Sequence, residues 1–405
     1  MNILMISPGF PAEMPWFTRG LAEVGVRVIG IGEQPERALP AVARSAIHLY
    51  VQTESLWNEG RLVEEVRRLA SRIPIDGVEC LWEPGVILAA RLREALGLDG
   101  MTVEQVLPFR DKERMKQVLD EAGIRTPRHT RVNDEAACRE AAERIGYPLI
   151  VKPIAGAGSA DTHRVDGPDD LERTLPRVRH VAELSVEEFI DGDEFTFDTI
   201  CIEGDIAYHN VAWYRPRPLI GRSVEWISPQ TIALRRPDAP ELATGCRMGR
   251  AVLAALGFRT GFTHMEWYRT ASGEAVFGEI AARPPGALSV DIMNYAYDID
   301  TYAGWAEAVC RGRFSQEVQP RYNAAVVFKR AQGSGRIQRV DGLERLVARY
   351  RPNIVCVDLL PLGAPRRNWK QTLLSDGHVI VRHPDLEATM EMADRIGTDL
   401  QIYAG

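Results

Sequence analysis

Short apolar runs alternate with amphipathic stretches over the first hundred residues. Residues 3–6, 26–31 and 78–82 have the length and composition of buried strands, and residues 59–72 and 84–96 repeat apolar side chains at helical spacing. Strands that alternate with helices predict a small parallel α/β domain. The Gly-x-Gly-x-x-Gly turn of dinucleotide-binding domains does not follow the first run, so we do not expect a nicotinamide enzyme.

The last hundred residues show a second pattern of this kind. Residues 323–329, 353–359 and 377–381 are typical of strands, and a helix is expected from about 384 to 396. The pattern predicts a small C-terminal α+β domain.

The composition excludes several classes of protein. With 405 residues, of which 45% are hydrophobic and 26% charged, the chain is expected to fold as a globular protein of two or three domains. A net charge of −7 without long basic runs argues against a nucleic-acid partner, and the six widely spaced cysteines form no metal-binding pattern. No apolar stretch is long enough to cross a membrane, so we expect a cytoplasmic protein that acts on small molecules.

Lysine is rare in this chain, since only five of the 49 basic residues are lysines. Lys112 lies in the first turn of a helix predicted over 111–122, where the helix dipole disfavours a cation, so it is either a tolerated surface residue or directed at an anion. Lys152 lies in a strand-like segment, 147–153, and the glycine-rich stretch 154–160 follows. Such a combination suits a phosphate-binding loop, although it is not a Walker A motif.

Residues 187–197 are predicted to form a strand, an acidic turn and a second strand. A connection of this kind can present backbone groups to a flat base and leave a carboxylate for ribose hydroxyls. An ordinary hairpin is the alternative.

The segment 262–286 carries the most informative pattern. Two β-rich runs flank Ser272-Gly273, and a two-residue loop there would place Glu266 directly opposite Glu279. Opposed carboxylates repel each other at a Cβ separation of about 4.5 to 5.5 Å, so a hard divalent cation is the natural bridge between them. The alternatives are an exposed hairpin with two solvated glutamates and a register shifted by one residue.

Taken in order, these motifs resemble those of the ATP-grasp superfamily over roughly residues 1 to 300, with a C-terminal extension. The resemblance implies an ATP-grasp fold of α/β and α+β class, with two lobes that sandwich ATP. The implied domains are a Rossmann-like N-terminal domain at 1–108, a lobe with the lysines, glycine loop and adenine hinge at 109–195, a catalytic lobe with the magnesium site at 196–310, and a small C-terminal α+β domain at 311–405.

The resemblance also implies the members of the site. The residues implied to bind ATP are Lys112, Lys152, Gly156, Gly158, Ser159, Glu187, Glu188, Phe189, Ile190 and Glu194. Glu266 and Glu279 match the magnesium carboxylates, with Mg²⁺ or Mn²⁺ as the ion. Residues 279–284 resemble the family's Glu-x-Asn-x-Arg run, except that Ala281 replaces the metal-binding asparagine. This departure leaves open a degenerate protein that binds nucleotide without turnover.

The activity that the resemblance implies is carboxylate activation. A substrate carboxylate attacks the γ-phosphate of ATP, and an amine then displaces phosphate from the acyl phosphate to form an amide or peptide bond. Arg283 is the candidate for gripping the carboxylate and the oxyanion, because a guanidinium makes two charge-assisted hydrogen bonds at once.

Within the superfamily, the chain looks most like the L-amino-acid ligases, so amino acids are the expected acid and amine. By position, the substrate-binding candidates are Arg283, His264, Gly286, Ala287 and the loop 214–225. A biotin-dependent carboxylase, a kinase of this fold, a nucleotide-biosynthetic ligase and a non-catalytic ATP-binding module are the alternatives. A homodimer is expected from the family.

Overall fold

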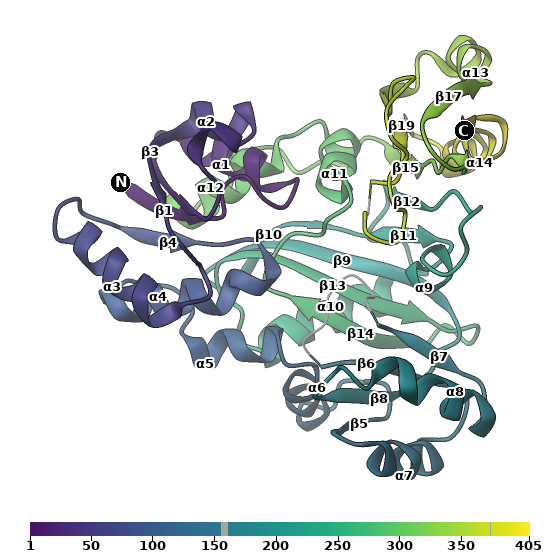
Figure 1. Ribbon diagram of the computed structural model, residues 1–405, viewed down its shortest axis with the longest axis horizontal. Coiled ribbons are helices and arrows are strands. Elements are labelled where there is room, and N and C mark those ends of the chain that lie inside the picture. Colours follow the sequence, from purple (N-terminus) through teal and green to yellow (C-terminus); the bar gives the residue numbers. More distant parts are fainter. Residues whose placement is uncertain (155–160, 373) are drawn as a thin grey trace.

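The N-terminal domain of the computed structural model is a parallel α/β unit, as the sequence predicts (Figure 1). The structure describes residues 1–154, 161–372 and 374–405. The elements of this domain are β1 (Asn2–Ile6), α1 (Met14–Glu23), β2 (Arg27–Gly32), η1 (Glu36–Ala38), α2 (Ala41–Ala46), β3 (Ile47–Gln52), α3 (Glu59–Ala70), β4 (Gly77–Glu79), η2 (Glu83–Gly85), α4 (Val86–Leu96), α5 (Val103–Val106) and η3 (Leu107–Phe109). The strands pair in parallel in the order β3-β2-β1-β4. The apolar runs predict every strand except β3, an edge strand whose side chains are half-buried or exposed.

A small lobe with an antiparallel sheet follows. Its elements are α6 (Lys112–Glu121), β5 (His129–Val132), α7 (Glu135–Ile145), β6 (Leu149–Pro153), β7 (His163–Val165), α8 (Pro168–Val178) and β8 (Leu184–Glu188). The strand order is β5-β8-β6-β7, and α7 and α8 pack their apolar side chains into the core of this lobe. Helix α6 begins where it is predicted, because the carboxylate of Asp111 accepts hydrogen bonds from the N–H groups of Glu113 and Arg114.

A large antiparallel sheet forms the centre of the molecule. Its strands are β9 (Asp193–Ile202), β10 (Asp205–Asn210), β11 (Ala212–Arg215), β12 (Gln230–Ala233), β13 (Gly261–Arg269), β14 (Ala275–Ala281), β15 (Asn323–Phe328), β18 (Ile354–Leu359) and β19 (Gly377–His383). They run in the order β14-β13-β9-β11-β12-β15-β19-β18, and β10 pairs with β9. Helix α10 (Ala243–Ala255) packs on one face, and α11 (Ser289–Tyr297) and α12 (Thr301–Arg311) pack on the other. The middle strands are therefore buried on both faces.

The C-terminal region extends this sheet. Strands β15, β18 and β19 match the predicted strands, and α14 (Leu386–Asp399) matches the predicted helix. The remaining elements are α9 (Pro218–Gly221), β16 (Gln332–Gly333), β17 (Ile337–Asp341), α13 (Leu343–Tyr350) and β20 (Gln401–Ala404). The expected domain limits at 195 and 310 both lie within or between strands of this one sheet, so the division into four domains stays a prediction.

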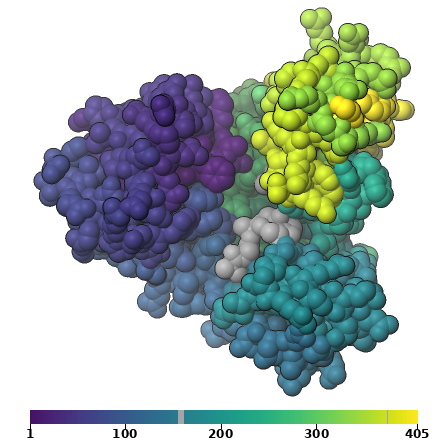
Figure 2. Space-filling model, viewed as in Figure 1, coloured from purple at the N-terminus to yellow at the C-terminus, as the bar shows by residue number. Residues whose placement is uncertain are grey.

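The N-terminal domain, the small lobe and the C-terminal region stand apart on the face of the molecule shown in Figure 2. The large sheet connects them, because the small lobe leads into β9 and the C-terminal strands join at β12. No helix in the described part of the chain has the length and apolar character needed to cross a bilayer.

Candidate active site

The β13–β14 hairpin places Glu266 directly opposite Glu279, as the sequence predicts. The predicted two-residue loop, however, is wrong. Arg269 pairs with Ala275, so the turn that joins the strands is longer. If both strands continued in the register that this turn sets, Glu266 would face Gly278, and the two carboxylates would not oppose each other.

A β-bulge at Gly278 restores the opposition. The register shifts by one residue between Glu266 and Trp267, which makes Gly278 the extra residue of β14. A Cβ atom at this position would lie 2.8 Å from the carbonyl oxygen of Glu266, so the close approach of the two strands requires glycine. The pairing of the carboxylates therefore depends on a residue that the apolar pattern does not single out.

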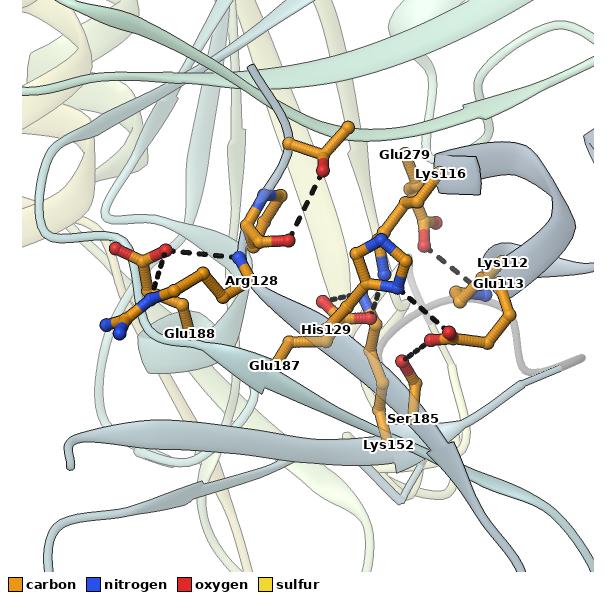
Figure 3. A network of polar contacts seen from close by, with 12 residues as sticks. Lys112, Glu113, Lys116, Arg128, His129, Lys152, Ser185, Glu187, Glu188 and Glu279 are labelled. Carbon is orange, nitrogen blue, oxygen red and sulfur yellow. Dashed lines mark hydrogen bonds and ion pairs between the residues drawn. The ribbon is translucent and has the colours of Figure 1, made fainter. Parts of the chain in front are cut away.

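Both predicted lysines lie beside carboxylates of this region (Figure 3). Lys112 Nζ is 3.3 Å from Glu279 Oε2, and Lys152 Nζ is 2.9 Å from Glu187 Oε2. Lys112, Lys152, Glu266 and Glu279 line one pocket between the small lobe and the large sheet. The carboxylate of Glu279 explains why a cation is tolerated in the first turn of α6, where the helix dipole disfavours it.

A third lysine, Lys116, belongs to this cluster although the sequence analysis does not assign it there. Lys116 and Glu187 form an ion pair in which neither side chain is more than 4% exposed. Burial by itself would raise the pKa of Glu187, but Lys116 and Lys152 hold it well below its usual range. The rarity of lysine is the sequence signal that points to Lys116, because three of the five lysines meet here.

The predicted adenine hinge connects β8 of the small lobe to β9 of the large sheet. Ile190 and Glu194 line the pocket together with Arg217, which comes from the segment between β11 and α9. Arg217 Nη1 donates a 2.9 Å hydrogen bond to the carbonyl oxygen of Ile190, and its Nε lies 3.3 Å from Glu194 Oε2. Burial and the charge of Glu266 raise the pKa of Glu194. A ligand that binds to the carbonyl oxygen of Ile190 and the carboxylate of Glu194 therefore has to compete with Arg217.

Other predicted ATP-binding residues lie differently. Glu188 borders the pocket, but its carboxylate pairs with Arg125 and Arg128. The ring of Phe189 lines an open groove instead, with the guanidinium of Arg164 4.2 Å from its centroid. The predicted glycine-loop residues lie outside the described residues: Gly156, Gly158 and Ser159.

A second pocket shares Glu266 and Glu279 with the first. The structure brings the substrate-binding candidates together in it: His264, Arg283, Gly286 and Ala287. The two glutamates therefore stand between a pocket that contains lysines and a pocket that contains arginine and histidine.

His264 is held between two carboxylates. Its Nδ1 is 2.6 Å from Asp198 Oδ1, and its Nε2 is 3.4 Å from Glu266 Oε1. Burial alone would lower the pKa of His264, but the charges of Asp198 and Glu266 raise it to about 9, so the imidazole is protonated at neutral pH. The hydroxyl of Tyr214 donates a 3.2 Å hydrogen bond to the same oxygen of Glu266. The sequence analysis does not identify Asp198.

Arg283 is positioned by the N-terminal domain. Its Nε donates a 2.5 Å hydrogen bond to Glu83 Oε2, and Arg110 Nη1 is 2.5 Å from the other oxygen of Glu83. A second carboxylate of this domain, Glu13, accepts a 3.0 Å hydrogen bond from the N–H of Ala287. No motif identifies Glu13 or Glu83, because their partners lie far away in the sequence.

The facing glutamates fit a magnesium ion that shares its other ligands with a nucleotide. In the described part of the chain, no group of three or more His, Cys, Asp and Glu side chains forms a complete metal site. Two carboxylates suit Mg²⁺, because this ion keeps several waters and is commonly bound with substrate phosphates. Ala281, the cross-strand partner of His264, adds no ligand atom.

Comparison with known proteins agrees with this geometry. Residues 22–100 match the model of an ATP-grasp N-terminal domain, and residues 109–211 match that of an ATP-grasp domain. The L-arginine-specific L-amino acid ligase of Bacillus subtilis is 30% identical over 236 residues, which are 56% of each chain. The alanine–anticapsin ligase of Bacillus subtilis is 25% identical over 279 residues, which are 63% of this chain and 58% of the relative. The match therefore spans little more than half the length of these curated relatives.

The same fold extends over the whole chain in a solved structure. The crystal structure of an L-amino acid ligase from Bacillus licheniformis superposes with a TM-score of 0.81 and 23% sequence identity. The superposition covers 100% of this chain and 98% of the ligase.

Proposed function

From the ATP-grasp fold and the two ATP-grasp domains of this chain, we propose that it is an ATP-dependent carboxylate–amine ligase. It joins amino-acid-like substrates through an acyl phosphate and releases ADP and phosphate. The observation that carries the proposal is that Glu266 and Glu279 line both pockets. During transfer, the phosphoryl group lies between the nucleotide and the attacking carboxylate. Glu266 and Glu279 lie between the two pockets, where this group would be.

The first pocket positions ATP. Lys112 and Lys152 hold its phosphates, and Glu266 and Glu279 hold Mg²⁺ or Mn²⁺. When bound, the metal ion would neutralise negative charge that develops on the phosphoryl group during transfer.

The hinge supplies the nucleoside contacts. The backbone around Phe189 and Ile190 faces adenine, and Glu194 binds the ribose hydroxyls after Arg217 moves aside. The two other acids of the hinge act indirectly. Glu187 holds Lys152 through an ion pair, and the carboxylate of Glu188 pairs with Arg125.

The second pocket performs the substrate chemistry. Arg283 holds the substrate carboxylate, one oxygen of which attacks the γ-phosphorus in line while the bond to ADP breaks. The amine then attacks the acyl carbon, Arg283 stabilises the oxyanion, and phosphate leaves. Glu83 orients the guanidinium of Arg283, and the charge of His264 offsets that of Glu266 beside the substrate.

Product analysis tests this function. Purified protein with ATP, Mg²⁺ and pooled amino acids is expected to release ADP and phosphate, and to form a condensed product that mass spectrometry detects. Release has to require both an acid and an amine. Bicarbonate dependence would indicate a carboxylase, AMP would indicate an adenylating ligase, and nucleotide binding without release would indicate a sensor; each of these outcomes overturns the proposal.

Two further features stay predictions. A homodimer is expected from the family resemblance, and light scattering after size-exclusion chromatography measures it. A cytoplasmic location is expected from the composition, and fractionation of the source cells measures it.

A further inference from the structure

The second pocket contains two more arginines. Arg222 follows α9 and Arg330 follows β15, and both line the pocket with Arg283 and His264. Both arginines are partly buried. Three guanidinium groups and one imidazolium therefore line a space in which the two shared glutamates are the only acidic residues among the described ones.

Within the described part of the chain, Arg283 and His264 are each in an ion pair, but Arg222 and Arg330 are not. Arg283 pairs with Glu83, and His264 pairs with Asp198. Among the described residues, no carboxylate oxygen forms a salt bridge with Arg222 or Arg330.

Their hydrogen bonds go to backbone carbonyl groups. Arg222 donates a 2.9 Å hydrogen bond to the carbonyl oxygen of Lys370, and Arg330 donates 2.8 Å hydrogen bonds to those of Val224 and Gly221. Because these acceptors are neutral, they satisfy N–H donors of the two guanidinium groups but do not neutralise the positive charges.

Two partly buried cations that form no ion pair are unfavourable in one pocket without an anion. Burial and the neighbouring charge of Arg222 lower the pKa of Arg330 to about 10, although the carboxylates of Glu225 and Asp376 act in the opposite direction. A bound carboxylate would relieve this repulsion, and paired guanidinium groups match its two oxygens. Glu225 does not fill this role, because its carboxylate pairs with Arg366.

We propose that Arg222 and Arg330 bind a second carboxylate of the substrates, separate from the carboxylate that reacts at Arg283. The proposal rests on the ligase function proposed above. The second carboxylate has two sources: the side chain of an acidic amino acid used as the acid, or the α-carboxylate of the amino acid used as the amine. Either source makes Arg222 and Arg330 determinants of specificity for an anionic substrate.

Substitution of Arg222 tests the proposal, because Arg222 donates to one backbone carbonyl, that of Lys370, whereas Arg330 holds the segment 221–224 through two. Steady-state phosphate release is measured with L-aspartate and L-glutamate against L-asparagine and L-glutamine as acids. It is also measured with free amino acids against amino-acid amides as amines. Arg222→Gln is expected to raise the KM of the partner that carries the second carboxylate by about 10- to 100-fold, with a much smaller change for its neutral analogue. The pair of substrates that shows this effect identifies the source.

Two control variants distinguish the loss of the positive charge at Arg222 from a loss of folded structure. Arg222→Lys keeps the charge and is expected to recover part of the affinity. Arg336→Gln removes an exposed arginine outside the pocket that also donates to a backbone carbonyl, and it is expected to change neither KM. Equal changes for charged and neutral substrates in Arg222→Gln, or no preference for the charged substrate in the unmodified protein, would overturn the inference.

A binding measurement tests the second carboxylate site independently of the proposed ligase activity. Calorimetry with a non-hydrolysable ATP analogue and Mg²⁺ compares L-glutamate with L-glutamine, and glycine with glycinamide, without turnover. Weaker binding of only the charged ligand of one pair to Arg222→Gln supports the second carboxylate site even if no product forms. Product formation without any such difference leaves the ligase function standing and rejects the site.

Discussion

The first pocket, proposed to bind the nucleotide (the nucleotide pocket), and the second, proposed to bind the substrates (the substrate pocket), differ in how their charges are arranged. In the nucleotide pocket, Lys112 pairs with Glu279, and Lys152 pairs with Glu187. In the substrate pocket, two arginines have no ion-pair partner among the described residues, and their hydrogen bonds go to neutral carbonyl groups. The lysines of the first pocket are therefore paired with carboxylates before any ligand binds, whereas the second pocket contains two arginines for which we propose a substrate carboxylate as the partner.

The two pockets also differ in where their residues come from. The nucleotide pocket is built between residues 112 and 279, within the small lobe and its neighbouring strands. The substrate pocket adds groups from the C-terminal region, and the N-terminal domain positions its arginine. Each pocket therefore draws on segments that are far apart in the sequence, but only the second depends on both the N-terminal domain and the C-terminal region.

The largest effect is expected from Glu187→Gln, because Glu187 is the shared counterion of two lysines at the nucleotide pocket. Lys116 and Lys152 would stay buried without their counterion, which costs about 3 to 5 kcal/mol of unfolding free energy. Urea unfolding measures the loss. Glu188→Gln is the matched control, since Glu188 is more exposed and its loss is expected to cost about 1 kcal/mol or less. Equal losses in both variants would mean that the buried cluster has no special role in stability.

Arg283→Ala is expected to act mainly on the rate, with some loss of stability because Glu83 keeps only Arg110 as its partner. Removal of one preorganised donor to the oxyanion lowers kcat by about 10² to 10³, or ~2.7 to 4 kcal/mol in the barrier. The Kd of a non-hydrolysable ATP analogue is expected to stay unchanged, because Arg283 lines only the substrate pocket. Single-turnover phosphate release and nucleotide titration measure the two quantities. A variant that lost nucleotide affinity and kept its rate would reverse the roles assigned to the pockets.

The pH dependence of stability probes the one histidine of the substrate pocket. With the pKa of His264 raised to about 9 in the folded protein, against ~6.5 when unfolded, its contribution is complete below about pH 6.5. The contribution is lost as the pH rises through about 9, and it amounts to on the order of 3 kcal/mol. Urea unfolding of the metal-free protein between about pH 6 and pH 10 measures it. Asp198→Asn is expected to flatten this dependence, and an unchanged pH profile in that variant would contradict the assignment.

The smallest effect is expected at the border between the pockets, from Gly278→Ala. The new Cβ would meet the Glu266 carbonyl oxygen at 2.8 Å, which costs about 1 to 3 kcal/mol and disturbs the opposition of Glu266 and Glu279. The apparent Mg²⁺ requirement of phosphate release is expected to rise with it. Gly60→Ala serves as the control, because a Cβ there has no atom within 4 Å. A loss of stability without any change in the Mg²⁺ requirement would separate the bulge from the metal site.

The local patterns predicted the elements that carry most of the candidate site, but fewer than half of all the helices and strands in the described residues. The parallel N-terminal domain, the capped helix that begins at Lys112 and the C-terminal strands are confirmed, and so is the ATP-grasp fold of mixed α/β and α+β class. The roles of the individual site residues stay predictions. The structure places most of the described candidates in the two pockets, and it places the ring of Phe189 in a groove outside them.

Distant contacts were beyond prediction for a physical reason. Glu83, Asp198 and Arg330 act through partners or neighbours that only folding brings near, so no spacing along the chain marks them. The facing of Glu266 and Glu279 was predicted correctly from an incorrect loop, because a longer turn and a bulge shift the register in opposite directions.

The sequence by itself determined which chemical groups this protein has and which strands and helices carry them, since propensity, capping and apolar periodicity act over a few residues. Tertiary structure decided which of those groups face one another. A bulge at one glycine, carboxylates from the first domain and arginines near the C-terminal strands complete the site, because charges separated by hundreds of residues interact only after the core has packed.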